Sequence, residues 1–221
     1  MPEQNDQAIK ARLREEYFDL LPQIHRVTAH LETEIRYRTL PIFHRLKHYE
    51  QLVVKSRVKE CESALKTLRR DQEGGVFDPD RPGDYSILNL PDLAGVRVLV
   101  FPHARLVEVD EALRTHFSGW TSKPVKDAGG VPFAPKFFGY CKDENDNTIS
   151  NVRGEYQVVP MLIGLFWEVE HSALYKPAPS LKGIGESAEM TKLKARVELA
   201  LSQFEEEFES FVLKNTQPPA F

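Results

Sequence analysis

One stretch of ten residues, Asp92-Leu93-Ala94-Gly95-Val96-Arg97-Val98-Leu99-Val100-Phe101, decides how we interpret the fold of this chain. It is nearly continuous in apolar residues, which is typical of a strand that lies in the middle of a sheet and is covered on both faces. Arg97 is the exception inside it. The pattern therefore predicts a central strand with a carboxylate, Asp92, at its beginning.

Two further strands are predicted from the surrounding sequence. Residues 52–59, Leu-Val-Val-Lys-Ser-Arg-Val-Lys, are rich in β-branched residues and alternate in polarity, which favours a strand over a helix. Because successive side chains of a strand point to opposite faces, Lys55, Arg57 and Lys59 are expected on one face. Residues 154–159, Gly-Glu-Tyr-Gln-Val-Val, form the other predicted strand and contribute Glu155.

Helical spacing of apolar residues marks most of the remaining chain. It predicts helices within residues 7–50, 62–70, 103–117 and 161–215, and Pro22 and Pro41 should divide the first segment into separate helices. The stretch from Lys126 to Tyr140 is expected to be mainly loop. We predict one domain over residues 1–221, with N-terminal helices in 7–50, the sheet core in 51–160 and C-terminal helices in 161–215.

Composition excludes several classes of protein. With 41% hydrophobic and 28% charged residues in 221, the chain is long and apolar enough for a compact globular domain. Its net charge of −4 gives no overall attraction to nucleic acid or to anionic lipid, so any anion site must be local. Cys61 and Cys141 have no metal-type spacing, and neither a signal peptide nor a membrane-length apolar run occurs, so we expect a cytoplasmic protein without a membrane partner.

The basic strand and the helix after it are suited to a polyphosphate. Three cations on one strand face neutralise phosphate charge, while the free amides and the Ser63 hydroxyl near a helix start add directional donors. The alternative is a solvated strand face with ordinary surface lysines, and the segment alone leaves both interpretations about equally open.

The two strand carboxylates have two interpretations as well. If Asp92 and Glu155 converge at one edge of the sheet, they suit Mg²⁺, which prefers one or two carboxylates together with phosphate oxygens and water. Isolated acidic residues are more often turn formers or surface charges. Convergence of the two side chains is what separates these interpretations.

Tyr140 and His171 each have a functional and a structural interpretation. Tyr140 lies close to Lys126 and Lys136, an arrangement that allows a purine to stack and its phosphates to be neutralised, although core packing is the commoner fate of such aromatic residues. His171 is more often a structural hydrogen-bond partner than a metal ligand or an acid–base group. No Walker loop, zinc pattern or Gly-x-Ser-x-Gly elbow is present.

Taken together, several motifs resemble the synthetase domain of the RelA/SpoT family over roughly residues 45–176. They are, in order, Ser56-Arg57-Val58-Lys59 with Ser63, Asp92-Leu93-Ala94-Gly95-Val96-Arg97, Val125-Lys126-Asp127, Pro135-Lys136, Gly139-Tyr140, Glu155-Tyr156-Gln157 and Trp167-Glu168-Val169-Glu170-His171. The resemblance implies an α+β fold of the nucleotidyltransferase-like type, with a mixed sheet flanked by N- and C-terminal helices. It implies transfer of the β,γ-pyrophosphate of ATP to the 3′-hydroxyl of GDP or GTP, which is alarmone, (p)ppGpp, synthesis.

The resemblance also implies roles for individual residues. ATP would be held by Arg57, Lys59, Ser63, Lys66 and Arg97. Asp92 and Glu155 would bind Mg²⁺, with Glu155 also activating the 3′-hydroxyl. The acceptor would contact Tyr140, Lys126, Lys136, Gln157 and His171. Because the family's hydrolase domain needs a His-Asp pair that this chain lacks, synthesis without degradation is expected.

The chain departs from the family pattern mainly on the acceptor side. Cys141-Lys142 follows Gly-Tyr where the family has Arg-Ser-Ile-His, only a short polar stretch separates Tyr140 from Glu155, Val159-Pro160 replaces an Arg-Thr, and Thr67 stands where a lysine is usual. These departures motivate two alternatives. One is a toxic relative, a toxin that pyrophosphorylates an adenine nucleotide or a tRNA 3′ end, and the other is an inactive nucleotide-binding module. The long apolar-striped C-terminal helix fits either the core or a homo-oligomer.

Overall fold

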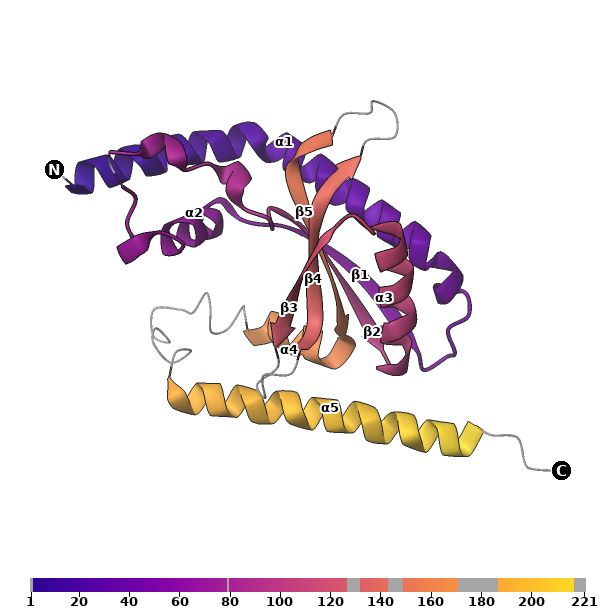
Figure 1. The fold of residues 1–221 in the computed structure, drawn as a ribbon. Coiled ribbons are helices and arrows are strands. Elements are labelled where there is room, and N and C mark those ends of the chain that lie inside the picture. Colours follow the sequence, from indigo (N-terminus) through magenta and orange to yellow (C-terminus); the bar gives the residue numbers. More distant parts are fainter. Residues whose placement is uncertain (1, 79, 127–131, 143–148, 171–186, 217–221) are drawn as a thin grey trace.

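A computed structural model of the chain describes residues 2–78, 80–126, 132–142, 149–170 and 187–216. In this part of the chain five strands form one sheet in the order β1-β2-β5-β4-β3 (Figure 1). The bounds are Gln51–Val58 (β1), Ala94–Phe101 (β2), Thr121–Lys126 (β3), Pro132–Lys142 (β4) and Ile149–Pro160 (β5). β2 and β5 are parallel, whereas the other neighbouring pairs are antiparallel, so the expected mixed sheet is confirmed.

Helices cover the two faces of the sheet unequally. The helices are Pro2–Phe43 (α1), Cys61–Arg70 (α2), Ala104–His116 (α3), Met161–Glu170 (α4) and Ala188–Thr216 (α5). α1 and α3 pack on one face, while α4 follows β5 directly onto the other face and contacts α5, which lies along one end of the sheet (Figure 1). None of the described helices is both long and apolar enough to cross a membrane.

The sheet buries one face because its strands alternate in polarity. On the covered face Val54, Val96, Tyr156, Val158 and Phe137 are all buried and join one core cluster with α1. The facing stripe of α1 includes Leu13, Ile24, Leu31 and Ile35, each with no exposed area. At about 25 cal/mol per Å² of apolar surface, burying each of these side chains is worth roughly 1.5–3 kcal/mol. On the opposite face Leu99 and Val159 pack with Trp167 of α4.

The predicted division of the first helical segment at its prolines is wrong. α1 continues through Pro22 and Pro41, both of which lie inside the helix. An interior proline costs roughly 3 kcal/mol because it removes one hydrogen bond and crowds the preceding turn. The apolar stripe on both sides of Pro22 is buried against the sheet, and this packing outweighs the cost.

The expected loop around Lys126 to Tyr140 is wrong for the described residues, since Lys126 ends β3 and residues 132–140 belong to β4. Pro124 and Pro135 suggested a loop because proline cannot donate to a sheet ladder. Both lie in the irregular section of the β3–β4 pair, between the Lys123–Lys136 and Val125–Phe133 pairs. Ala134 has a φ of 43° at the same place, so the bulge accommodates the prolines without ending the strands.

Gly139 has a packing role on the covered face. It pairs with Gly154 across β4 and β5, and the Trp120 ring lies on the two glycines. A Cβ at Gly139 would lie 2.4 Å from the Trp120 ring, which is too close for any side chain. The Trp120 ring also packs at a tilt against the rings of Phe117 and Tyr156, so the glycine pair makes room for an aromatic cluster.

Glu205 joins α5 to α4. Its side chain is 2% exposed and accepts a hydrogen bond of 3.3 Å from the backbone amide of Leu162, in the first turn of α4. A carboxylate is favourable there because free amides and the helix dipole point toward it. Burial nevertheless dominates and raises the pKa of Glu205 to about 7.

This raised pKa predicts a pH-dependent stability. Because the uncharged acid is favoured in the folded state, the free energy of unfolding should fall by on the order of 3 kcal/mol as pH rises from about 4.5 to about 7. Glu205→Gln, which keeps an acceptor for Leu162 without the charge, should remove this part of the dependence and raise the melting temperature at pH 8. Urea unfolding at pH 5 and pH 8 measures both effects. Glu206→Gln, on an exposed position of α5, is the control; equal pH slopes for Glu205→Gln and the parent would contradict the prediction.

Candidate active site

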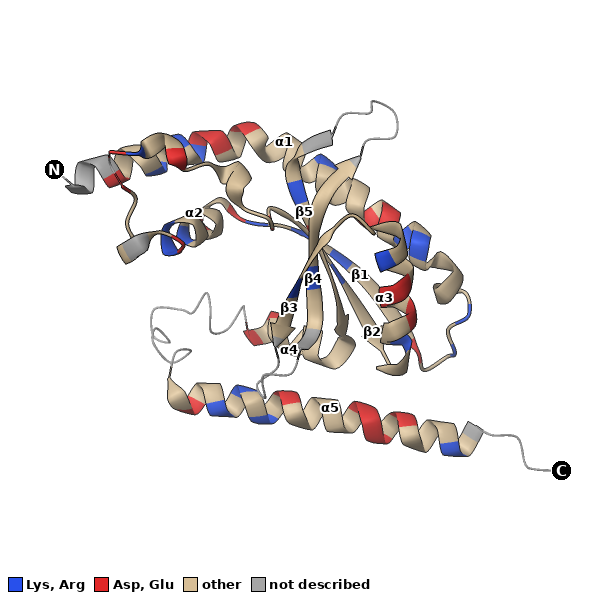
Figure 2. Ribbon diagram, in the orientation of Figure 1, with Lys and Arg blue, Asp and Glu red and all other residues tan. Residues whose placement is uncertain are grey.

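Two transverse rows of residues cross the open face of the sheet, one residue from each strand. The register places the following residues in the first row: Lys55, Arg97, Gln157, Lys136 and Lys123. The second row consists of Arg57, Gly95, Glu155, Phe138 and Thr121. Figure 2 shows the resulting basic positions of β1, β3 and β4 near the middle of the sheet. The predicted common face is therefore confirmed for Lys55 and Arg57, whereas Lys59 follows the last residue of β1.

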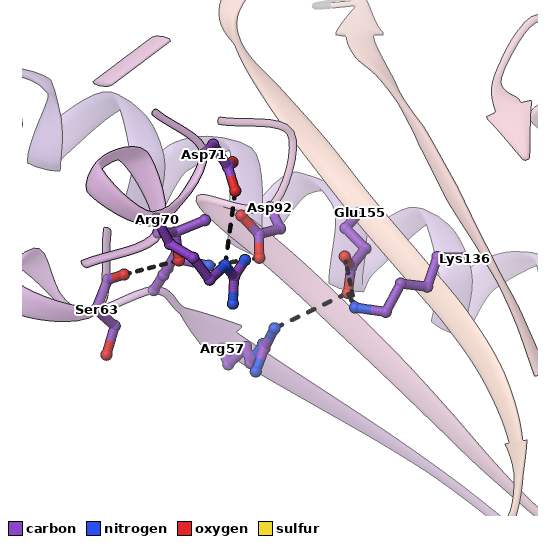
Figure 3. Close-up of polar contacts among 9 residues, drawn as sticks. Arg57, Ser63, Arg70, Asp71, Asp92, Lys136 and Glu155 are labelled. Atoms are coloured by element: carbon purple, nitrogen blue, oxygen red, sulfur yellow. Dashed lines mark hydrogen bonds and ion pairs between the residues drawn. The ribbon is translucent and has the colours of Figure 1, made fainter. Parts of the chain in front are cut away.

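Arg57 reaches across a whole strand to a carboxylate. It lies opposite Gly95, and a Cβ there would be 3.4 Å from both Cγ and Nε of Arg57, tighter than most contacts. The glycine thus leaves room for the arginine to lie over β2. Arg57 Nη2 is 3.9 Å from Glu155 Oε1 on the far side (Figure 3).

Glu155 is a buried carboxylate between two cations. It is 5% exposed, and Lys136 Nζ lies 3.3 Å and 3.1 Å from its two oxygens. Figure 3 shows Lys136 and Arg57 approaching it from opposite sides. Burying a charge is costly unless it is paired. Here Arg57 on β1 and Lys136 on β4 are the partners of Glu155 on β5.

Asp92 has one oxygen in an ion pair and one without a partner. Lys59 Nζ lies 2.6 Å from Asp92 Oδ2, and both side chains are largely buried. Asp92 Oδ1 is buried without a hydrogen bond among the described residues. Such an oxygen suits a hard cation, and two carboxylates plus substrate oxygens are the usual set for Mg²⁺. The described residues contain no cluster of three or more His, Cys, Asp or Glu side chains that could hold a metal, so phosphate or water would have to complete the set.

Arg97 is crowded by another cation. Burial, followed by the charge of Arg57, lowers its pKa, while Glu168 and Glu155 act in the opposite direction. The Arg97 guanidinium carbon also lies 5.8 Å from the centre of the Trp167 ring. An anion, or a planar group between the two guanidinium groups, would relieve this repulsion.

The central cavity, of about 690 Å³, contains both carboxylates and a set of cations. Its charged lining consists of the cations Arg70, Arg81, Lys123 and Lys136 and the carboxylates Asp71, Asp78, Asp84, Asp92 and Glu155. Asp92 and Glu155 therefore converge on one cavity, which distinguishes a shared site from two unrelated surface charges. Arg97 and Gln157 instead line a second cavity of about 520 Å³, here called the Arg97 cavity, together with Arg57 and Trp167. Glu155 lines both cavities, so they meet at its carboxylate.

α2 presents three polar residues toward the central cavity side at helical spacing. Ser63, Thr67 and Arg70 follow one another at intervals of four and three residues, which places them on one face. The Thr67 hydroxyl donates 2.9 Å to the Ser63 carbonyl, and Thr67 and Arg70 both line the central cavity. The lining does not include Lys66, which is exposed.

Tyr140 lies apart from the two carboxylates. It is 48% exposed near the end of β4 and lines a third cavity of about 920 Å³ with Trp120 and Arg153. This cavity shares Pro91, Lys123 and Phe138 with the central cavity, so the two are adjacent.

The predicted site residues thus fall into groups. One group surrounds Glu155 and consists of Arg57, Arg97, Lys136 and Gln157. The other is the ion pair of Asp92, just before the first residue of β2, with Lys59. The Lys126 side chain and His171 lie outside the described residues. Arg70 and Lys123 line the central cavity but were not among the predicted ligands. The 63, 67, 70 spacing could have indicated Arg70, whereas Lys123 required recognising β3.

Comparison of sequences alone assigns no relative: no family model matches, and no curated protein matches either. Solved structures share the fold. Small alarmone synthetase 1 from Bacillus subtilis matches with a TM-score of 0.67 at 17% identity, covering 92% of this chain and 100% of that one. The same enzyme bound to AMPCPP gives 0.63 at 18% identity, covering 90% and 99%.

A GTP pyrophosphokinase family protein from Streptococcus pneumoniae matches with a TM-score of 0.59 at 19% identity, covering 92% of this chain and 98% of that one. At such identities the likeness concerns the fold, and it extends over almost the whole of each chain. The chain described here has the fold of the small alarmone synthetases.

Proposed function

We propose that this chain is a RelA/SpoT-type pyrophosphotransferase that moves the β,γ-pyrophosphate of ATP to the 3′-hydroxyl of GDP or GTP. The observation that carries the proposal is the convergence of Asp92 and Glu155 on one cavity whose lining also includes Arg70, Lys123 and Lys136. The shared fold with small alarmone synthetases supports it, as does the motif order.

In the proposed arrangement ATP spans the two cavities that meet at Glu155. The base enters the Arg97 cavity, where Arg57 and Arg97 offer cationic planes. The phosphates extend into the central cavity toward Lys59, Ser63 and Arg70. Asp92, through its unpaired oxygen, and Glu155 would hold Mg²⁺, which neutralises phosphate charge when bound.

Transfer needs little covalent work from the protein. The acceptor 3′-oxygen forms a bond to the β-phosphorus, the bond from that phosphorus to the α–β bridging oxygen breaks, and AMP leaves. The hydroxyl proton passes to the Glu155 carboxylate, while the surrounding cations stabilise the charge that builds up on the phosphate oxygens. The acceptor approaches from the side of Lys123 and Lys136, with Tyr140 available for its base in the adjacent cavity.

The function is tested by following label from γ-labelled ATP, with Mg²⁺, into GDP, GTP, ATP or deacylated tRNA. We expect labelled product with GDP or GTP, and Glu155→Gln should lower the rate by roughly 10²–10⁴-fold because the base is lost. Glu62→Gln, an exposed carboxylate on the far side of α2 that pairs with Arg14, is the matched control. Transfer to tRNA or ATP alone would support a toxic relative, and transfer to no acceptor would overturn the proposal in favour of a binding module.

The ion pairs of the free protein predict that metal and nucleotide bind together. Lys59 forms an ion pair with Asp92, and Lys136 forms one with Glu155. Without nucleotide, Mg²⁺ would therefore have to bind carboxylates whose charge is already neutralised. Phosphates that draw these lysines away would free the carboxylates. Titration calorimetry with α,β-methylene ATP should show nucleotide affinity rising by roughly tenfold or more with Mg²⁺, and Asp92→Asn should abolish that gain. Tight Mg²⁺ binding to the nucleotide-free protein would contradict this coupling.

A further inference from the structure

Gln157 is a buried amide in the middle of the polar face. It is 2% exposed and lines the Arg97 cavity on the central strand β5. Its neighbours in the transverse row are Arg97 on β2 and Lys136 on β4, both of them cations that can only donate hydrogen bonds. Among the row's side chains that the structure describes in this cavity, Gln157 therefore offers a neutral acceptor.

One hydrogen bond fixes which end of the amide is available. Gln157 Nε2 donates 2.8 Å to the carbonyl of Ala134, the residue with φ of 43° in the β4 bulge. The reverse orientation would bring two oxygens together, so the bond orients the amide with Nε2 toward β4. Oε1 is consequently the atom left for another partner.

That oxygen has no partner in the free protein. Gln157 Oε1 is buried and accepts no hydrogen bond among the described residues. An unsatisfied buried acceptor is costly, and in a native fold it often marks a place where a ligand supplies the missing donor. Water does not reach the oxygen either, so a ligand must displace a neighbouring side chain; Arg97, next in the row and repelled by Arg57, is the one we expect to move.

The surrounding cavity favours a planar, electron-rich ring. Two guanidinium groups and the Trp167 indole provide flat surfaces for stacking. An acceptor fixed at the edge of such a ring distinguishes purines by their substituent at carbon 6. Adenine carries an amino group there, which donates, whereas guanine carries an oxygen, which would face Oε1 as a second acceptor.

We infer that Gln157 determines the base of the pyrophosphate donor, with Oε1 accepting from the 6-amino group of adenine and excluding guanine. This inference rests on the proposed function, because it concerns the donor of the same reaction. It moves Gln157 from the predicted acceptor contacts to the donor side. The role is one of specificity and takes no part in the bond-breaking step.

Binding measurements with uncleavable donors test the assignment. Titration calorimetry in the presence of Mg²⁺ compares α,β-methylene ATP with its analogue that lacks the 6-amino group and with α,β-methylene GTP. The parent protein should bind the adenine compound roughly tenfold or more tightly than the analogue that has hydrogen in place of the 6-amino group. Its preference over the guanine compound should be larger still. In Gln157→Met the adenine compound and the analogue without the 6-amino group should bind equally, because the hydrogen-bond acceptor Oε1 is gone.

The ratio of the two affinities separates recognition from structural damage. If Gln157 only anchors the Ala134 carbonyl, Gln157→Met will weaken both compounds equally and leave their ratio unchanged, which overturns the inference. Lys10→Met is the control, since Lys10 pairs with Asp6 within α1, lines neither the central nor the Arg97 cavity and should leave the ratio as in the parent. Melting curves establish that both variants are folded, and Gln157→Leu replaces Gln157→Met if the latter is not.

The result is independent of turnover. If Gln157→Met removes a preference for adenine, but the parent protein transfers pyrophosphate to no acceptor, the proposed function is rejected. The inference is then retained as a property of a nucleotide-binding module. If pyrophosphate is transferred to GDP or GTP, but the parent protein binds the adenine compound and the analogue without the 6-amino group equally well, the proposed function is retained and the role of Gln157 is rejected.

Discussion

The fold depends on the two-residue period of β2 and β5, the parallel pair in the middle of the sheet. Even-numbered residues such as Val96 and Tyr156 enter the core under α1, while odd-numbered residues such as Arg97 and Glu155 face the opposite side. A slip of one residue in either strand would expose the core side chains and bury the charges. The same pattern thus creates the hydrophobic core and collects the polar residues into rows.

Charge balance on the polar face follows from this packing. Arg57 can cross β2 only because Gly95 has no side chain, and its guanidinium then lies between Arg97 and the buried Glu155. The carboxylates keep the cations folded onto the sheet, and the cations keep Glu155 from being an unpaired buried charge. A polyphosphate with its metal presents both signs of charge and can exchange with each pair. The free protein therefore holds its cations and carboxylates close to the places where such a ligand would need them.

The sequence predicted the elements whose pattern is local and missed those that depend on tertiary packing. The apolar run of β2 and the alternation of β1 identify strands without further information, and both were correct. Pro22 and Pro41 misled because their cost is visible locally, whereas the compensating contact between α1 and the sheet is not. β4 was missed because Pro135 lies in a bulge whose existence depends on the pairing with β3. For the site, residue types and order pointed to Arg57, Asp92 and Glu155, but the assignment of Gln157 needed the register across five strands.

The departures of this chain from the family pattern concern α2, the end of β4 and, at Val159-Pro160, the end of the central strand β5, where Val159 is buried under α4. Thr67 stands where a lysine is usual, but Arg70 lies one turn further along the same face of α2 and lines the same cavity, so a cation remains available there. Cys141 follows Tyr140 in β4, where it is buried near Glu34 and burial raises the pKa of its thiol; it belongs to the core and also lines the third cavity with Tyr140. In the proposed function the acceptor side depends on Tyr140, Lys123 and the other walls of the third cavity, which come from α1, α3, the segment before β3, β3, β4 and β5. The central rows of β1, β2 and β5 are constrained by the core beneath them, and so is Trp120 in the wall of the third cavity. Tyr140 and Lys123 are exposed and can change without disturbing the core, so in the proposed function the choice of acceptor is most open to divergence at these two positions.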